Sequence, residues 1–188
     1  IGIDINPIIE ASNSQPFSHV HNPGIAVGGH CIPVYPKFYL STDKEATLPS
    51  SSIAVNESMP KRAVHRLFGS DKNALEGKTI AVLGAAYRNG VKETAFSGVF
   101  PLVEEIELLG GKAVVHDPLY SDEELLALGL PAFQLGSHCD AAIVQTDHEM
   151  YGDLSSSDLP GAEIIFDGRG IVDESKLSPI SVIVLGIG

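Results

Sequence analysis

The chain has 188 residues and a formal net charge of −12, with 44% hydrophobic and 19% charged residues. This composition predicts a soluble, folded protein. The acidic excess argues against a nucleic-acid partner, because phosphate backbones require clustered Lys and Arg. No apolar run approaches the roughly 20 residues of a membrane span, so no membrane partner is expected either.

The chain holds two cysteines, Cys31 and Cys139, which lie far apart and lack Cys-x-x-Cys spacing. A disulfide scaffold or a zinc cluster is therefore not expected, and a reducing cytoplasm is the predicted location. The chain begins Ile1-Gly2-Ile3-Asp4 with no initiating Met and no basic stretch. This start predicts the interior of a longer protein and not a signal peptide.

Two helices are expected in the first part of the chain. Asn6 as an N-cap and Pro7 in the first turn predict a short helix. Gly, Pro and His interrupt residues 16–36 so often that no regular element is expected there. Apolar residues spaced along residues 51–68 predict a second helix, which Pro60 should interrupt or kink.

The pattern changes near residue 75. Residues 69–77 are polar and predict a linker, so we divide the chain into a partial central module, residues 1–75, and a second domain, residues 76–188. Alternating strands and helices in the second domain predict an α/β fold: a Rossmann-like parallel sheet with flanking helices, preceded by the partial helical and loop module. The predicted helices are 99–109, which stops at Gly110-Gly111, and a segment capped by Ser121; the predicted buried strands are 79–83, 112–116, 141–144, 163–166 and 181–185.

The most informative segment surrounds Cys31. Gly24, Gly28 and Gly29 precede it, and glycine lets a ligand approach the backbone amides closely. A cysteine placed directly after such residues can present an exposed thiol, whose anion is the reactive form. Residue type alone favours the opposite interpretation, a buried and inert cysteine, because free Cys is commonly a small core hydrophobe.

An ordered series of motifs favours the exposed thiol. Gly-Gly-His-Cys-Ile-Pro-Val, residues 28–34, resembles the nucleophile loop of the UDP-glucose/GDP-mannose dehydrogenase family, in the form typical of the branch that acts on UDP-N-acetylhexosamines. The resemblance covers nearly the whole chain. Segments similar to the family follow in family order, at residues 8–13, 22–36, 55–60, 77–87, 116–118, 146–148 and 166–169.

The resemblance implies part of a nucleotide-sugar 6-dehydrogenase, which oxidises the C6 alcohol of a UDP-sugar to a carboxylate for polysaccharide precursors. Cys31 would attack the aldehyde intermediate to give a thiohemiacetal, and a second hydride transfer would give a thioester that water hydrolyses. NAD would be bound mainly by a domain absent from this chain, so the chain alone should be inactive. A homodimer is implied for the full-length protein. The residues that match the family's sugar-nucleotide loop, with backbone amides as donors, are Asn22, Pro23, Gly24, Ile25, Ala26, Val27 and Gly28.

The second domain resembles the family's UDP-binding domain. Residues 84–88 occupy the expected first strand-to-helix turn, where phosphate sites form, but lack the glycines of Gly-x-Gly-x-x-Gly. A generic NAD-binding domain is therefore disfavoured. Tyr87 and Arg88 match an aromatic–Lys pair that contacts the ligand in the family. The alternative is a solvated arginine beside a core tyrosine.

Two positions depart from the family pattern. Tyr35 stands where the family usually has Asp, and Ala95 replaces the Arg of its Asp-Thr-Arg-Glu-Ser motif. His30 is a tempting replacement base, although adjacent side chains often point apart, and Lys92 is a hypothetical replacement cation. These departures leave a second hypothesis, a non-catalytic nucleotide-sugar-binding relative.

Five further residues receive structural interpretations. Asp117, which precedes Pro118, is expected to form a turn or a cap, and Cys139 to pack at the start of a strand. Arg169 is expected to pair with an acid in a loop. His138 and His148 lack partners at the spacing of a metal site.

Overall fold

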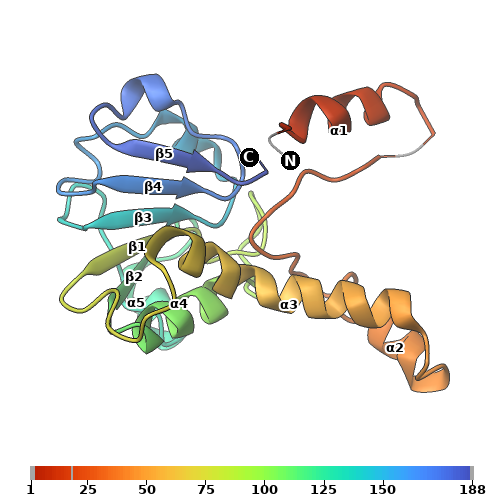
Figure 1. Cartoon of the computed structure of the whole chain (residues 1–188). Coiled ribbons are helices and arrows are strands. Elements are labelled where there is room, and N and C mark those ends of the chain that lie inside the picture. Colours follow the sequence, from red (N-terminus) through yellow and green to blue (C-terminus); the bar gives the residue numbers. More distant parts are fainter. Residues whose placement is uncertain (1–2, 18, 187–188) are drawn as a thin grey trace.

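The computed structural model describes residues 3–17 and 19–186, so the opening residues Ile1 and Gly2 lie outside the described part. Its centre is a five-stranded sheet in the order β2-β1-β3-β4-β5, in which all neighbouring strands are parallel (Figure 1). The predicted α/β class is confirmed. The strands are β1 (Thr79–Leu83), β2 (Lys112–His116), β3 (Ala141–Val144), β4 (Ile164–Asp167) and β5 (Ser181–Val184).

The side chains on both faces of the central strands are apolar because other apolar residues of the protein pack against each face. In β1, Val82 pairs with Val115 of β2 and with Ile143 of β3, and all three are fully buried. Two apolar clusters result, one on each side of the sheet. The edge strand β5 is only half-buried, so the prediction of a buried strand there was wrong: β5 pairs with β4 alone.

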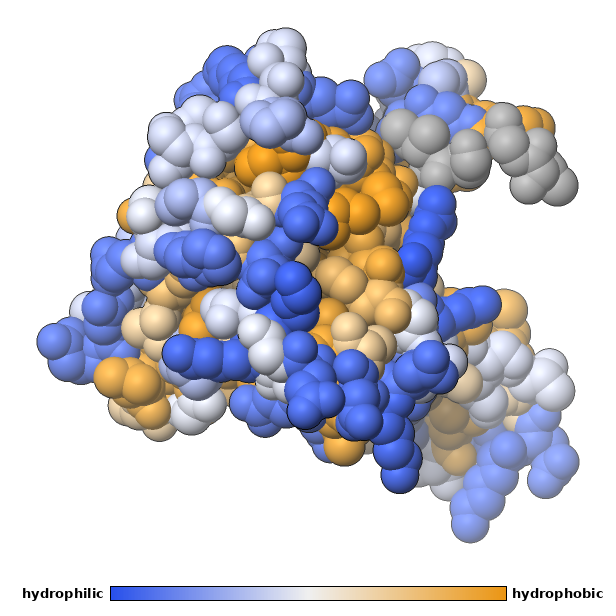
Figure 2. Space-filling view, turned by 60° about the vertical axis from the view of Figure 1, so that its left-hand side comes forward, coloured by the Kyte–Doolittle hydropathy of each residue, from blue (hydrophilic) through white to orange (hydrophobic). Residues whose placement is uncertain are grey.

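Helices cover the sheet unevenly. α4 (Val99–Leu108) follows β1 and is terminated by Leu109 and Gly110, whose φ of +84° suits glycine. α5 (Asp122–Ala127) begins after Ser121 with the expected capping box. After β3 and β4 the chain forms short 3₁₀ helices, η1 (Glu149–Asp153) and η2 (Glu174–Lys176), in segments for which no helix was predicted. Apolar surface stays visible between hydrophilic residues on the face shown in Figure 2.

The first part of the chain contains α1 (Asn6–Asn13), α2 (Tyr35–Thr42) and α3 (Thr47–Phe68). α2 was not expected, although Pro36 in its first turn is a helix-start signal. Asn6 is not the cap of α1: the helix follows Ile5, and the Asp4 carboxylate accepts the Asn6 N–H at 2.9 Å.

α3 is one helix of 22 residues that is not interrupted at Pro60. Proline removes one backbone donor, but the end of α3 packs on α4 and buries Ala63 and Val64, and this packing offsets the loss. The predicted linker, residues 69–77, is also anchored. Leu75 is 2% exposed, and its N–H donates to the Leu109 carbonyl at 3.0 Å. Within the described ranges, no helix is long and apolar enough to cross a membrane.

Candidate functional site

Cys31 is exposed at the corner between the glycine loop and α2. Its carbonyl accepts N–H bonds from Val34 at 3.1 Å and Tyr35 at 2.9 Å, which form the first turn of α2. Gly29 has a φ of +89°, and its N–H donates to the Ala95 carbonyl at 2.8 Å. The thiol is therefore presented to solvent between two fixed points of the backbone.

The loop before Cys31, residues 22–30 and called the cysteine loop below, is packed against the sheet domain, residues 76–188. Ile25 is fully buried and belongs to the apolar cluster that also contains residues of α4 and the sheet. A Cβ at Gly28 would lie 2.6 Å from Tyr87 Cβ and 2.8 Å from the Phe96 carbonyl oxygen. Only a residue without a side chain fits there. The sheet domain thus determines where the loop lies.

The seven predicted loop residues do not form one surface. Asn22 and Val27 are exposed, whereas the Ile25 and Ala26 side chains are buried. Pro23, Gly24 and Gly28 are half-buried. The Val27 amide, one of the donors expected for a ligand, is bound within the protein by the Asn56 side chain at 2.8 Å. The structure brings Gly28 against Tyr87, and Gly24 against a different residue, Arg169.

Tyr87 and Arg88 lie next to the cysteine loop. Tyr87 is half-buried, its N–H donates to the Glu93 carbonyl at 3.0 Å, and its ring would be 3.0 Å from a Cβ at Gly29. Arg88 is exposed, with its guanidinium carbon 5.9 Å from the Tyr87 ring centroid. The aromatic residue therefore supports the loop, and the cation extends to the surface beside it.

Arg169 is the residue near this loop that the sequence analysis undervalued. Its Nε donates to the Gln145 carbonyl at 2.8 Å and its Nη2 to the Tyr87 carbonyl at 3.5 Å. These bonds go to carbonyls, and the described contacts of the guanidinium include no direct ion pair of the expected kind with an acid. Burial lowers the pKa of Arg169, while the charge of Asp147 raises it. Its position just after β4, at the carboxyl edge of a parallel sheet where ligands bind, is the signal that could have identified it.

The turn after β1 binds an internal carboxylate. Asp117 Oδ2 accepts the N–H groups of Ala85 at 2.7 Å and Ala86 at 2.9 Å, and it lies 3.1 Å from His148 Nε2. Oδ1 accepts the Leu119 N–H, which is the expected turn role. Burial raises the pKa of Asp117, but the bonds from His148, Ala86 and Leu119 outweigh burial and lower it overall. The carboxylate therefore stays charged inside the protein.

The contacts of Asp117 overturn the expectation that residues 84–88 form a phosphate-binding turn at a helix N-terminus. The helix after β1 begins only at Val99, so residues 84–88 do not form a helix N-terminus. The two amides that could face a dinucleotide phosphate already bind Asp117. The described residues therefore do not fit the diphosphate of NAD at this turn.

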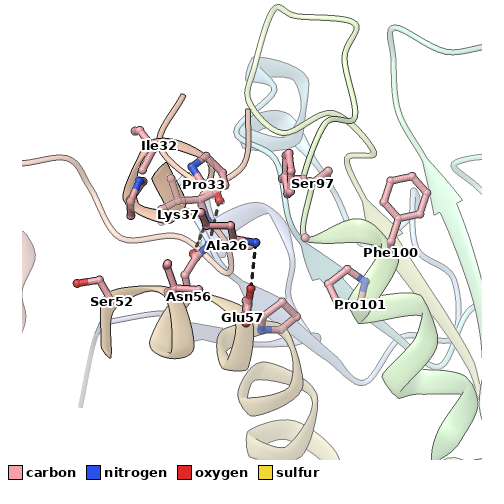
Figure 3. A pocket seen from close by; sticks show the side chains of 16 residues that line it. Ala26, Ile32, Pro33, Lys37, Ser52, Asn56, Glu57, Ser97, Phe100 and Pro101 are labelled. Atoms are coloured by element: carbon pink, nitrogen blue, oxygen red, sulfur yellow. Dashed lines mark hydrogen bonds and ion pairs between the residues drawn. The ribbon is translucent and has the colours of Figure 1, made fainter. Parts of the chain in front are cut away.

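A cavity of about 590 Å³ lies beside the cysteine loop (Figure 3). Residues 26–27, 32–33 and 96–98 line it together with residues of α2, α3 and the start of α4, and most of its lining is apolar. Lys37 and Glu57 form an ion pair at its edge, with 3.6 Å between Nζ and Oε1. Ile32 and Pro33 line the cavity, but their neighbour Cys31 does not.

The residues at the departures from the family pattern have defined contacts. His30 Nε2 lies 3.4 Å from Glu93 Oε2, which links the cysteine loop to the sheet domain. Lys92 is paired with Glu124 and lies over the Tyr120 ring. Tyr35 is 63% exposed in the first turn of α2.

The second cysteine differs sharply from the first. Cys139 is fully buried just before β3, as expected, and burial raises the pKa of its thiol to about 11. Among the residues that the structure describes, no group of three His, Cys, Asp or Glu side chains could hold a metal ion.

Comparison with known proteins assigns the chain to a family. Residues 81–174 match the UDP binding domain of the UDP-glucose/GDP-mannose dehydrogenase family, and residues 1–59 match its central domain. The chain belongs to this family. It is 32% identical, over 100% of its length, to the UDP-N-acetyl-D-mannosamine dehydrogenase of Pyrococcus horikoshii, and 27% identical to the enzyme of that name from Methanococcus maripaludis.

Solved structures of family members share the fold. The structure of the UDP-D-ManNAc dehydrogenase from P. horikoshii superposes with a TM-score of 0.77 and 29% identity, over 100% of this chain. A UDP-glucose dehydrogenase from Pyrobaculum islandicum has a TM-score of 0.76, 24% identity and 99% coverage, and shows the fold alone. The chain spans less than half of these relatives: 44% and 46% of the two sequences, and 45% and 44% of the two structures.

Proposed function

We propose that this chain is the central and UDP-binding part of an NAD-dependent 6-dehydrogenase that oxidises a UDP-sugar, most specifically a UDP-N-acetylhexosamine. The observation that carries the proposal is the exposed thiol of Cys31 at the end of a loop fixed against the sheet domain. Arg88, an exposed cation, lies beside the same loop and suits a diphosphate. The family assignment supports a nucleotide sugar as the ligand.

The proposed chemistry uses Cys31 as a nucleophile. Its thiolate adds to the C6 aldehyde, forming a C–S bond, and the oxygen takes up a proton to give a thiohemiacetal. Transfer of the C6 hydride to a nicotinamide acceptor, with release of the hydroxyl proton, would then give a thioester, and attack of water on its carbonyl carbon would release the carboxylate, a proton and the free thiol. Tyr35 stands where the family usually has Asp, and it cannot act as a carboxylate base. We therefore assign the activation of water to residues at other positions.

NAD is the proposed hydride acceptor, bound by a part of the protein outside these residues. The occupied turn amides of Ala85 and Ala86 support that placement. We further propose a homodimer of the full-length protein, a cytoplasmic location consistent with two free thiols, and a role in supplying polysaccharide precursors.

The test is turnover by the full-length protein. NADH formation with UDP-N-acetylmannosamine is followed at 340 nm for the wild type, Cys31→Ser and Cys139→Ser. We expect Cys31→Ser to lower kcat by about 10³-fold or more, because removal of a nucleophile abolishes the covalent route. Cys139→Ser, which changes a buried thiol, should retain the wild-type KM. Equal turnover by Cys31→Ser and wild type would contradict the assignment.

The second candidate is a non-catalytic nucleotide-sugar-binding relative. Tyr35 and Ala95, which replace two polar groups of the family pattern, favour it. Binding of UDP-sugars measured by calorimetry, with no NADH formed from any of them, would establish this alternative.

A further inference from the structure

The side chain of Asn56 binds the backbone of the cysteine loop on both sides of one residue. Its Oδ1 accepts the Val27 N–H at 2.8 Å, and its Nδ2 donates to the Val27 carbonyl at 3.0 Å. The partners are separated by 29 residues, so the contact joins α3 to the loop across a long stretch of chain. Two bonds to one residue orient both peptide groups that flank Val27.

These two bonds tie the loop to the wall of the cavity. Asn56 is half-buried and lines the largely apolar cavity in Figure 3, to whose lining Ala26 and Pro60 also contribute. Both bonds are exposed to solvent, so without the Asn56 amide the Val27 N–H and carbonyl would bind water and the loop would lose this tie to α3. Water satisfies these groups but does not fix their orientation, so the loop backbone becomes free to rearrange.

The loop is tied to the sheet domain immediately after Val27. Gly28 lies against Tyr87, and the Gly29 N–H donates to Ala95. Cys31 follows two residues later and leads into α2. The backbone before the thiol is therefore held at two points, by Asn56 on α3 and by Ala95 on the sheet domain.

We propose that Asn56 is a positioning residue for Cys31, in the reaction proposed above, on which this inference rests. Asn56 does not act on the substrate itself. Its amide fixes the two peptide groups of Val27, so that the following glycines hold the sulfur at one position relative to the sheet domain. A displacement of about 1 Å of a reacting group costs up to about 100-fold in rate.

The test compares three variants of the full-length protein. Asn56→Ala removes both bonds, and Asn56→Asp keeps the acceptor for Val27 N–H but opposes the Val27 carbonyl with a negative charge. Ser52→Ala is the matched control: Ser52 lies one turn earlier on α3, lines the same cavity, and donates to Leu48 within the helix. We expect kcat to fall about 10- to 100-fold in Asn56→Ala, and also to fall in Asn56→Asp, with KM for the UDP-sugar within about threefold. Ser52→Ala should match the wild type.

Hydrogen exchange separates positioning from a loss of folding. In Asn56→Ala, exchange in a peptide covering residues 25–34 should rise about tenfold, while a peptide covering β1 should exchange as in the wild type. Unchanged loop exchange together with wild-type kcat would overturn the inference. So would faster exchange in β1 in parallel with the loss of activity. If the wild type oxidises no UDP-sugar, the proposed function fails, and the exchange experiment still decides whether Asn56 holds the loop.

Discussion

The two parts of the chain differ in where their apolar residues are buried. In the sheet domain, β1 and β3 are buried on both faces, mostly by residues of the same domain. Before Gly69, by contrast, α2 buries no residue and α1 only Ile9. The buried residues Ile25, Ala63 and Val64 of this first part belong to the core cluster of the sheet domain. The cysteine loop is thus held by a core that lies in another part of the sequence.

The largest expected effect tests this shared core. Ile25→Ala should lower the free energy of unfolding by about 3 to 4 kcal/mol, because it leaves a cavity in a fully packed cluster. Val27→Ala is the control on the same loop: its side chain is 44% exposed, and its cost should stay below about 1 kcal/mol. Urea denaturation measures both. Equal costs for the two variants would show that the loop does not share the core of the sheet domain.

A second, smaller effect tests whether the buried carboxylate of Asp117 stabilises the sheet domain. Asp117→Asn replaces a buried carboxylate by a group that presents an N–H to backbone donors, and should cost about 2 kcal/mol at pH 7. Asp71→Asn, on an exposed segment, should cost less than about 0.5 kcal/mol.

The pH dependence follows from the same carboxylate. Because the pKa of Asp117 is lower in the folded protein than its ordinary value of 3.8, its contribution is fully present above that value. The contribution is lost as the pH falls below 3.8 toward the folded pKa. Urea titrations at descending pH should therefore show a shallower acid loss of stability in Asp117→Asn than in the wild type. Parallel curves would contradict the assigned role.

The smallest expected effect concerns the surface beside the loop. Lys92→Ala should change the affinity for a UDP-sugar by less than about twofold, because Lys92 is already paired with Glu124. Arg88→Ala, which removes an exposed cation next to Tyr87, should weaken binding about tenfold or more. Calorimetry of both variants measures the difference. A clear loss of affinity in Lys92→Ala would restore the hypothesis that it replaces the family arginine.

The sequence predicts the strands well because each is a short apolar run bounded by turn residues. It also predicts Ser121 as a cap, since capping depends on neighbours in sequence. α2 was missed because prolines and glycines precede it, and Leu75 was assigned to a linker because its neighbours are polar. The composition of a short segment does not show whether one of its residues packs against other parts of the protein.

The sequence predicts which residues belong to the candidate site, but not the contacts that hold the loop of this site in place. The motif order identified Cys31, Tyr87 and Arg88, whose roles stay proposals. The contacts of Asn56 and Arg169 join segments far apart in the chain, and no periodicity encodes them. The binding of Asp117 to the amides after β1 was likewise hidden, because it depends on two strands lying side by side.

The contrast between the two thiols gives the chain its own reporter group. Cys139 is fully buried with a raised pKa, whereas Cys31 is exposed. A maleimide dye added near neutral pH would attach at Cys31 and spare Cys139, since the thiolate is the reacting form. Fluorescence from that dye would then follow ligand arrival at the loop without an engineered labelling position.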